Sequence, residues 1–350
     1  MDHPTIEASP LDAAAVLAWY DRHARKLPWR VPPDARAAGE KPDPYRVWLS
    51  EVMLQQTTIG AVLNYYRRFL ELWPTVDDLA AAPLDAVLVE WAGLGYYARA
   101  RNLHACAIAV AERGGFPTTY AGLLELPGIG AYTAAAVAAI CFDEPVAVID
   151  GNVDRLLARY CALPVPVRDV KPELRAFLQQ SVPTRAGDLA QALMDLGATV
   201  CAPRQALCMV CPLQPNCLGT RTGAPLQYPA KSEKPERPTR YGHAFVIRDA
   251  AGDIYLRQRP PTGVLAKMTE VPTGTWNDSK TAAAFPFEAD WKPLGQVIHV
   301  FTHFRLELEV WTATDSSDSV LSDGWWSSPD ALGKEALPSL FTKVLKLALR

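Results

Sequence analysis

Hydrophobic positions recur at helical spacing from the start of the chain to about residue 221. Residues 11–23, LDAAAVLAWYDRH, fit one amphipathic helix, and residues 43–56, DPYRVWLSEVMLQQ, fit a second. The second begins with Asp43, a residue type that caps helix N-termini, and continues with Pro44, which suits the first helical position. No sustained alternation of period two occurs in this part, so it is predicted to be all-α.

Glycines and prolines divide the rest of this helical part. Residues 58–73 predict one helix that stops before Pro74. Residues 84–115 predict two helices that are interrupted at Gly-Leu-Gly, residues 93–95, and end at a pair of glycines. The first part of the chain is therefore expected to run as helix after helix.

The pattern changes after residue 221. Residues 222–240 combine recurrent prolines with clustered charges and are predicted to form an extended linker. Residues 241–260 predict two short strands around a Gly-Asp turn, and residues 299–313 alternate as one strand. The apolar face of that strand would carry Phe304, Leu306, Leu308 and Val310. Residues 337–350 return to a helical pattern, so a smaller α+β domain is expected after the linker.

Composition and charge limit the class of protein. Of the 350 residues, 49% are hydrophobic and 21% charged, and no apolar run reaches the ~18 residues of a membrane span. The N-terminal residues lack the basic and apolar regions of a secretory signal, which favours a location in the cytoplasm or in the DNA compartment of a cell. Because the net charge is −3, a nucleic-acid site would have to be a local basic patch. Residues 96–101 and 231–240 are candidates, although from charge alone a solvated surface explains each more simply.

Four cysteines lie close together in the spacing C-x6-C-x2-C-x5-C: Cys201, Cys208, Cys211 and Cys217. A cytoplasmic chain disfavours disulfides, so the group indicates a metal site. Zinc sites usually pair two short Cys-x2-Cys turns, and only one occurs here. One compact loop can instead supply four thiolates to an iron–sulfur cluster. The spacing favours the cluster and leaves zinc open.

A glycine turn, Leu-Pro-Gly-Ile-Gly at residues 126–130, precedes an alanine-rich helical pattern. A dinucleotide-binding motif would need a strand before it, whereas residues 119–126 look helical. Gly128 and Gly130 would expose backbone N–H groups at a helix N-terminus, where a DNA phosphate can bind. The motif alone leaves a turn without any ligand equally open.

Two acidic residues suit acid catalysis. Glu51 lies on a predicted helix near Trp48 and Met53, so burial should raise its pKa toward the range that a general acid needs. Asp150 lies where an apolar run meets a predicted helix. An ion pair with Arg46 is the alternative for Glu51, and a simple N-cap is the alternative for Asp150. Together, an acid and a carboxylate can cleave a glycosidic bond, and loss of a purine from DNA is the same chemical problem.

These motifs together resemble the endonuclease-III-like superfamily of helix-hairpin-helix DNA glycosylases. The resemblance is carried by LPGIGAYTAAAV, by VIDGNVDR and by the cysteine loop. The blocks LPWR, WLSEVMLQQT, WAGLGYYARARNL and QALMDLGA are similar to the MutY-type adenine DNA glycosylases within it. LRQRPPTGVLAKMTEVP and FTHF resemble that family's 8-oxoguanine-reading domain, so the resemblance covers almost the whole chain.

The resemblance implies a multi-domain fold. Residues 1–221 would form an all-α glycosylase domain, with the helix-hairpin-helix at about 120–137 and the iron–sulfur loop at 201–217. Residues 222–240 would be the linker, and residues 241–350 an α+β Nudix-like domain. The implied activity is removal of adenine mispaired with 8-oxoguanine or guanine in double-stranded DNA. The implied protein is a monomer that holds a 4Fe–4S cluster and binds no membrane.

The resemblance also assigns roles to individual residues. Glu51 is carried over as the acid that protonates adenine N7, and Asp150 as the residue that stabilises the sugar cation. The residues that would support this pair are Tyr132 and Asn152. The weaker matches to an adenine pocket are Arg25, Trp29, Arg30 and Gln191. The matches to residues that contact DNA are Gln56, Tyr96, Gly128 and Gly130. The matches to the loop that reads 8-oxoguanine are Phe301, Thr302 and His303. Gln56 and Tyr96 match residues that enter the base stack from which adenine is flipped out.

The chain departs from the superfamily pattern at several positions. Tyr132 stands where the lyase branch has a lysine, and Asp154 stands where some relatives have one, so a monofunctional glycosylase is favoured. Thr302 replaces a serine, and its extra methyl group stiffens the side chain, so the preference for 8-oxoguanine over guanine is expected to change. A Glu-rich Nudix box does not occur in the sequence, so pyrophosphate hydrolysis is not expected.

Three other functions would fit parts of the sequence. A bifunctional pyrimidine glycosylase/lyase is disfavoured by the missing lysine and the extra C-terminal domain. A non-catalytic lesion-binding protein is disfavoured because both acids are present. A zinc-dependent DNA-binding regulator would be colourless when purified, whereas an iron–sulfur protein is yellow-brown.

Overall fold

The computed structural model describes residues 6–231, 236–314 and 323–349. The chain divides into two compact units. The first comprises Met1–Thr58, Thr75–Ala80 and Ala105–Glu233, and the second comprises Ile59–Pro74, Ala81–His104 and Lys234–Arg350. The domain limits at residues 221 and 240 stay a prediction. None of the described helices is long and apolar enough to cross a membrane.

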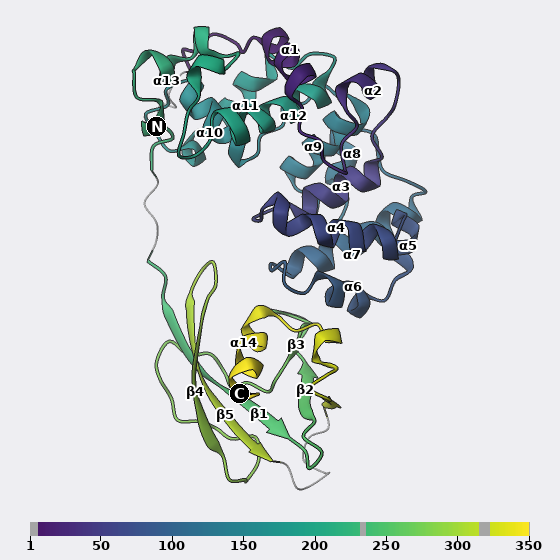
Figure 1. Ribbon diagram of the computed structural model, residues 1–350, viewed down its shortest axis with the longest axis vertical. Helices are drawn as coiled ribbons and strands as arrows, with labels where there is room; N and C mark the ends of the chain where they lie inside the picture. Colours follow the sequence, from purple (N-terminus) through teal and green to yellow (C-terminus); the bar gives the residue numbers. More distant parts are fainter. Residues whose placement is uncertain (1–5, 232–235, 315–322, 350) are drawn as a thin grey trace. The chain divides into compact units, whose positions relative to one another are not determined.

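The first unit consists of helices joined by short turns (Figure 1). The helices are α1 (Ala13–His23), α2 (Pro33–Ala37), α3 (Pro44–Met53), α8 (Tyr120–Leu124), α9 (Ala131–Phe142), α10 (Gly151–Tyr160), α11 (Lys171–Gln179), α12 (Ala186–Asp195) and α13 (Leu218–Arg221). Two further helices, α5 (Val76–Ala81) and α7 (Ala98–Glu112), contribute residues to both units. The Asp43 cap is confirmed, because its carboxylate accepts from the backbone N–H of Tyr45 at 2.8 Å.

Helix α9 forms the centre of the first unit. Its residues from Thr133 to Cys141 are all buried, and it contacts α3, α8 and α12. A helix that is apolar on every side must lie inside the protein. Gly187 on α12 permits the closest approach, because a Cβ there would lie 2.5 Å from the carbonyl oxygen of Ala139. The helix that follows the predicted glycine turn therefore belongs to the core of this unit.

The second unit includes α4 (Ile59–Leu72) and α6 (Leu84–Trp91). The predicted interruption after α6 is confirmed, since α6 ends at Trp91 and α7 begins at Ala98. Gly93 and Gly95 take φ values of 103° and 73°, a backbone region that glycine enters without steric cost. The break between the two helices is thus encoded by the glycines.

A mixed sheet forms the C-terminal part of the second unit. The strands are β1 (Thr239–Arg248), β2 (Ile254–Gln258), β3 (Thr269–Glu270), β4 (Lys292–Val300), β5 (Arg305–Thr314) and β6 (Gly324–Ser327). The order is β3-β2-β1-β5-β4, with β6 paired to β2. Strands β1 and β5 run parallel, and the other pairs are antiparallel. Helix α14 (Ser339–Ala348) completes the predicted α+β part.

The single strand predicted over residues 299–313 is wrong. β4 ends at Val300 and β5 begins at Arg305, so the segment contains a hairpin turn closed by a 2.9 Å hydrogen bond from the Phe301 N–H to the Phe304 carbonyl. Apolar and polar residues continue to alternate through this tight turn, so the sequence pattern does not reveal it. The predicted apolar face is confirmed, because its four residues are buried in one hydrophobic cluster.

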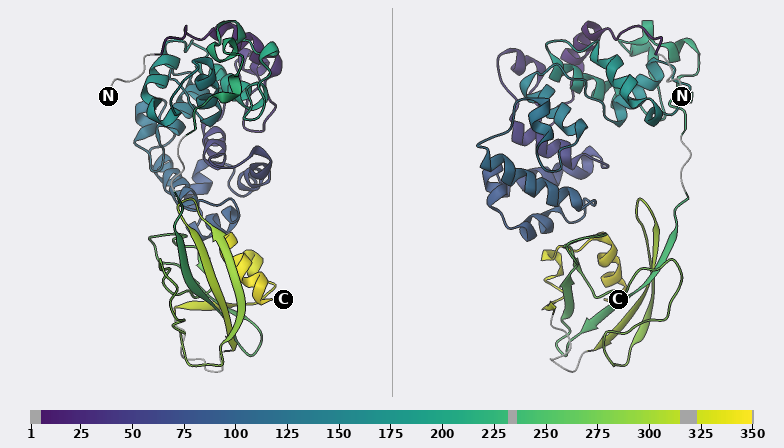
Figure 2. Two further views of the ribbon diagram at one scale, coloured as in Figure 1. Left: turned by 90° about the vertical axis from the view of Figure 1, so that its left-hand side faces the viewer. Right: turned by 180° about the vertical axis from the view of Figure 1, so that it is seen from behind.

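The sheet is covered on two faces. Figure 2 shows α14 on one side of the strand layer, where Leu340 and Phe341 join the buried cluster of β1, β2 and β5. On the other face Phe245 packs against Trp291 and Trp311. Most of the central strand β1 is thus buried, whereas the edge strand β4, which leads into the hairpin tip, is mostly exposed.

Candidate active site

Glu51 and Tyr132 meet between two packed helices of the first unit. Glu51 lies near the end of α3, only 6% exposed, and Tyr132 is the second residue of α9. The Tyr132 hydroxyl donates to Glu51 Oε2 over 2.5 Å. This bond leaves Oε1 of the same carboxyl as the oxygen that could carry a proton.

The surroundings of Glu51 favour its protonated form. Burial raises the pKa of Glu51, whereas the Tyr132 hydrogen bond and the charge of Arg30 lower it and the charge of Asp150 raises it further. Arg46, the partner considered for a surface ion pair, lies 3.7 Å from Asp43. The electrostatics of Glu51 are thus those of a buried acid, as the sequence predicted.

Asp150 is both a helix cap and a neighbour of Glu51. Its carboxylate accepts hydrogen bonds from the backbone N–H groups of Asn152 at 2.9 Å and Val153 at 2.8 Å. The Asn152 side-chain amide donates to Oδ2 at 2.8 Å. Burial chiefly raises the pKa of Tyr132, with further contributions from the charges of Glu51 and Asp150. The N-cap alternative is therefore correct, and the same carboxylate also lies within electrostatic reach of the predicted acid.

The glycine turn leads directly into α9. Gly128 has a φ of 71°, and Gly130 is the exposed N-cap of α9, without a side chain to cap the first N–H groups. The preceding residues form α8, a helix and not a strand, which confirms the rejection of a dinucleotide motif. This helix N-terminus can accept an anion two residues from Tyr132.

The predicted adenine-pocket arginines share one partner that the sequence analysis missed. Arg25 Nε lies 2.6 Å from Asp195 Oδ1, and Arg30 Nη1 lies 2.9 and 2.8 Å from the two oxygens of that carboxylate. Asp195 is fully buried at the end of α12. Trp29 and Gln191 are also buried, at 6% and 2% exposed. An aspartate inside the apolar run ALMDLG should have signalled a buried ion pair.

The four cysteines of the loop are partly buried, and none forms a disulfide. Burial raises the pKa of the Cys211 thiol to about 11, and the charges of the other three cysteines contribute to the same rise. Cys211 therefore lies within electrostatic reach of the other three. Among the described residues, no three Cys, His, Asp or Glu side chains converge as a ready-made site for a single ion. Four thiols on one loop still provide the donor set that an iron–sulfur cluster uses.

Two arginines of α10 contact this loop, and one of them, Arg155, also contacts Asn152; the sequence analysis missed both. Arg155 donates to Asn152 Oδ1 at 3.0 Å and to the carbonyl of Cys201 at 3.0 Å. Arg159 is 2% exposed and donates to Cys201 Sγ at 3.3 Å. The sequence contained a signal for them: Arg155 and Arg159 are four residues apart on the helix that Asp150 caps, so they lie on the same helical face.

The two residues predicted to enter the base stack share an unusual backbone. Gln56 has a φ of 60° and Tyr96 a φ of 50°, and both side chains are exposed. Left-handed conformations are costly for residues other than glycine and often mark functional sites. Each residue thus projects from a strained turn.

The predicted 8-oxoguanine loop lies at the tip of the β4–β5 hairpin. Phe301 turns inward, with its ring centroid 4.7 Å from that of Phe304, while Thr302 and His303 are exposed. The Thr302 hydroxyl donates to the Tyr96 hydroxyl at 3.2 Å. These residues line a pocket of about 530 Å³. The second unit thus brings together the predicted reading loop and one predicted stack-entering residue.

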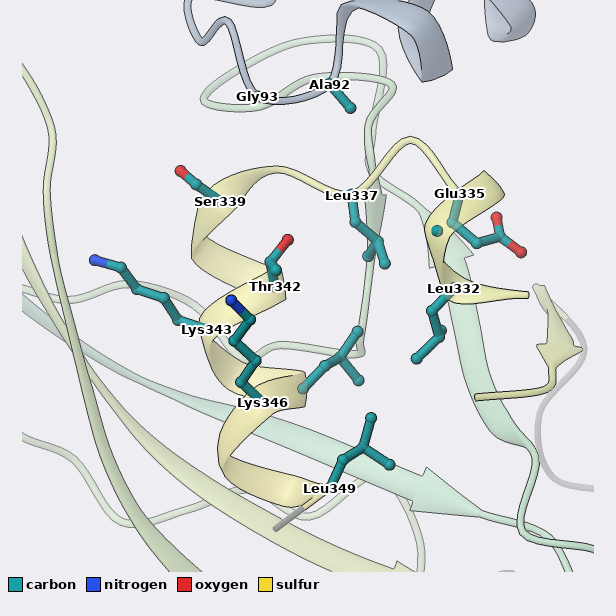
Figure 3. Close-up of a pocket in the computed structure, with 12 residues that line it drawn as sticks. Ala92, Gly93, Leu332, Glu335, Leu337, Ser339, Thr342, Lys343, Lys346 and Leu349 are labelled. Carbon is teal, nitrogen blue, oxygen red and sulfur yellow. The ribbon is translucent and has the colours of Figure 1, made fainter. Parts of the chain in front are cut away.

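A separate pocket of about 570 Å³ adjoins α14 (Figure 3). Leu337, Leu345 and Leu349 line it beside Lys343 and Lys346. It contains no residue that the sequence analysis assigned to a site.

Comparison with protein families places two matches along the chain. Residues 49–180 match the family model described as HhH-GPD superfamily base excision DNA repair protein. Residues 243–347 match the model of the NUDIX domain. The predicted order, an all-α helix-hairpin-helix part before a Nudix-like α+β part, is confirmed.

Curated relatives carry one common name. The chain is 36% identical over 363 residues to the adenine DNA glycosylase of Homo sapiens, an alignment that covers 85% of this chain and 66% of the human one. It is 34% identical over 402 residues to that of Rattus norvegicus, covering 95% and 77% respectively. Among solved structures it is similar to a thermostable thymine-DNA glycosylase, with a TM-score of 0.52 and 28% identity over 60% of this chain and 95% of the other.

Proposed function

The chain belongs to the adenine DNA glycosylases of base excision repair, and from this premise we propose that it hydrolyses the glycosidic bond of adenine paired with 8-oxoguanine or guanine. The enzyme is a DNA glycosylase, and its substrate is double-stranded DNA. The observation that carries the mechanism is the buried Glu51 carboxyl, which accepts a hydrogen bond from Tyr132 and lies within electrostatic reach of Asp150.

Glu51 acts as the general acid. Burial raises its pKa, so a larger fraction of the carboxyl is protonated at neutral pH than for an exposed glutamate. Tyr132 fixes Oε2, and the proton on Oε1 passes to adenine N7. The bond from the sugar C1′ to adenine N9 then breaks, its electron pair leaves with the protonated base, and positive charge develops on the sugar.

Asp150 stabilises that positive charge. Three N–H donors fix its carboxylate at the N-terminus of α10, so its orientation needs no rearrangement during the reaction. Water adds to C1′ and loses a proton to the Glu51 carboxylate, which restores the acid. Because Tyr132 occupies the position of the lyase lysine, no Schiff base forms there and strand cleavage does not follow.

Other residues bind the DNA. Arg25, Trp29, Arg30 and Gln191 surround the extruded adenine. The backbone N–H groups after Gly128 and Gly130 bind a phosphate. Gln56 and Tyr96 enter the stack, and Phe301, Thr302 and His303 contact the base opposite adenine. Gln56, Tyr96, Thr302 and His303 are exposed, as are Gly128 and Gly130, and this exposure supports their assignment to DNA contacts.

A 4Fe–4S cluster would be held by Cys201, Cys208, Cys211 and Cys217. When bound, it would cross-link the loop through four iron–thiolate bonds and take no part in hydrolysis. The proximity of Arg159 to Cys201 Sγ supports a negatively charged ligand set. Iron and acid-labile sulfide in the yellow-brown protein would support the cluster, whereas zinc in a colourless one would contradict it. We also propose that the protein is a cytoplasmic monomer. Its three segments would be the glycosylase domain at residues 1–221, the linker at 222–240 and the Nudix-like domain at 241–350.

Single-turnover release of adenine tests the function. Duplexes would carry adenine opposite 8-oxoguanine, guanine or thymine, and products would be separated with and without alkali. We expect fast release from the first, slower release from the second, none from the third, and strand breaks only after alkali. Direct strand breaks at an oxidised pyrimidine without adenine release would favour a glycosylase/lyase.

A further inference from the structure

The turn between α6 and α7 presents one tyrosine outward and the next inward. Tyr96 is 48% exposed and Tyr97 only 5%. The φ of Tyr96 is 50°, a conformation that a tyrosine adopts only when its surroundings enforce it. The contacts that hold this turn therefore decide where the Tyr96 ring points.

Hydrogen bonds fix the backbone of this turn. The carbonyl of Gly95 accepts from the Trp91 indole N–H at 3.1 Å and from Arg99 Nη2 at 3.5 Å. The hydroxyl of Tyr65 donates to the Ala92 carbonyl at 2.9 Å. These bonds hold the main chain but leave the Tyr96 side chain to other contacts.

Arg99 supplies a cation–π contact to the ring, in addition to the hydrogen bond that the Tyr96 hydroxyl accepts from Thr302. Its guanidinium carbon lies 5.3 Å from the centroid of Tyr96 and 5.4 Å from that of Trp91. Both distances are within the range of cation–π attraction. Trp91 is fully buried and lies edge-on to Phe69 at 5.8 Å, so it does not move with the surface. Arg99 thus connects an exposed ring to the core of its unit.

The position of the Arg99 guanidinium between the two rings costs it part of its solvation by water. Burial lowers the pKa of Arg99 to about 10, and the neighbouring Tyr96 raises it in part. A guanidinium whose only task was to bind phosphate would gain more from full exposure. The half-buried position between two rings indicates a role toward the tyrosine.

We propose that Arg99 is a positioning residue for base extrusion: its guanidinium holds the Tyr96 ring in the orientation in which that ring enters the DNA stack. The proposal rests on the proposed function, because it requires that adenine leaves the duplex before cleavage. Arg99 acts through Tyr96 and does not contact the reacting atoms. A lysine should replace it only poorly, since an ammonium lacks the planar face with which a guanidinium can stack on rings.

A double-mutant cycle tests the proposal in the full-length protein. The variants are Arg99→Gln, Arg99→Lys, Tyr96→Ala and the pair Arg99→Gln/Tyr96→Ala, with Arg67→Gln, an exposed arginine of α4, as the control. The measurements are single-turnover adenine release, fluorescence of 2-aminopurine placed beside the target adenine, and binding to a duplex with an abasic site. Unfolding temperatures show which variants keep the fold.

We expect Arg99→Gln and Arg99→Lys to slow release and extrusion by about 2- to 30-fold, with abasic-duplex binding retained. In the Tyr96→Ala background, Arg99→Gln should add no further loss. Equal losses in both backgrounds, full rescue by lysine, or weaker abasic binding in proportion to the rate would overturn the proposal. If the wild-type protein releases no adenine, the proposed function fails, while the fluorescence signal still decides whether Arg99 acts through Tyr96.

Discussion

Tyr132 and Glu51 share a hydrogen bond of 2.5 Å that joins the N-terminus of α9 to the end of α3. The phenol donates and the carboxyl accepts, so the bond favours the ionised carboxylate. Burial acts in the opposite direction and is the larger effect. The pKa of Glu51 is therefore set mainly by burial and by the opposing Tyr132 hydrogen bond, and mutation of Tyr132 separates the two effects.

Replacing Tyr132 with phenylalanine should shift the pH dependence of adenine release. The hydrogen bond lowers the pKa of Glu51, so its loss raises that pKa further. Release needs protonated Glu51 and falls as the pH rises through this pKa. In Tyr132→Phe the fall should lie at higher pH than in the wild type, measured by single-turnover rates across pH. A fall at lower pH would contradict the assignment of the acid.

Glu51→Gln should slow cleavage of the glycosidic bond strongly and retain DNA binding. The amide has the shape of the acid but cannot donate the proton, and loss of a general acid costs about 10²–10⁴-fold in rate. Release rates and binding to the A:8-oxoguanine duplex are the measurements. Turnover close to that of the wild type would exclude Glu51 as the acid.

The same variant should change stability with pH. Because the pKa of Glu51 is raised in the folded state, wild-type stability falls as the pH rises above the ordinary glutamate value of about 4.3. Glutamine avoids this loss, so Glu51→Gln should unfold at a higher temperature than the wild type at neutral pH and show no such advantage at pH 4. Thermal unfolding at both pH values checks the sign.

Asp150 allows charge and capping to be separated. Asparagine is as good an N-cap as aspartate, so Asp150→Asn should keep α10 and its stability while it slows adenine release strongly. Asp150→Ala should lose the cap as well, at a cost of about 1 kcal/mol in the free energy of unfolding. Equal rates for Asp150→Asn and the wild type would show that the cap is the residue's whole role.

Asp195 should matter far more for stability than a surface acid. Removing it leaves two arginines without their buried partner, and breaking such a pair costs about 3–5 kcal/mol. Glu125, which pairs with Arg113 at 2.9 Å on the surface, is the control, and Glu125→Ala should cost less than about 1 kcal/mol. Urea unfolding of Asp195→Ala and Glu125→Ala compares the two.

Thr302→Ser tests the tip of the reading loop. The serine keeps the hydroxyl that donates to Tyr96 and removes the methyl group that restricts its rotation. We expect the ratio of release from A:8-oxoguanine to release from A:G to change by several-fold, with the A:G rate nearly constant. An unchanged ratio would show that the methyl group is not decisive.

Local sequence patterns predicted most helices and the burial of Glu51. They did not predict contacts between residues far apart in the sequence. Burial of Glu51 follows from its apolar helical neighbours, and the break after α6 follows from two glycines. The partnership of Asp195 with Arg25 joins residues 170 positions apart, and no local spacing encodes it. Alternation did not reveal the hairpin at Phe301, because the residues of the turn continue the period; only the resemblance placed a loop there.

The close packing of α9 has a consequence for how damaged DNA is aligned. A phosphate bound at the N-cap Gly130 would be held two residues from Tyr132, about 3 Å along the helix axis. That offset is set by covalent geometry within one buried helix and not by the packing of separate parts. Substitutions elsewhere in the chain can weaken the binding of the DNA backbone. They cannot change the distance along α9 between the bound phosphate and Tyr132, the residue that orients Glu51.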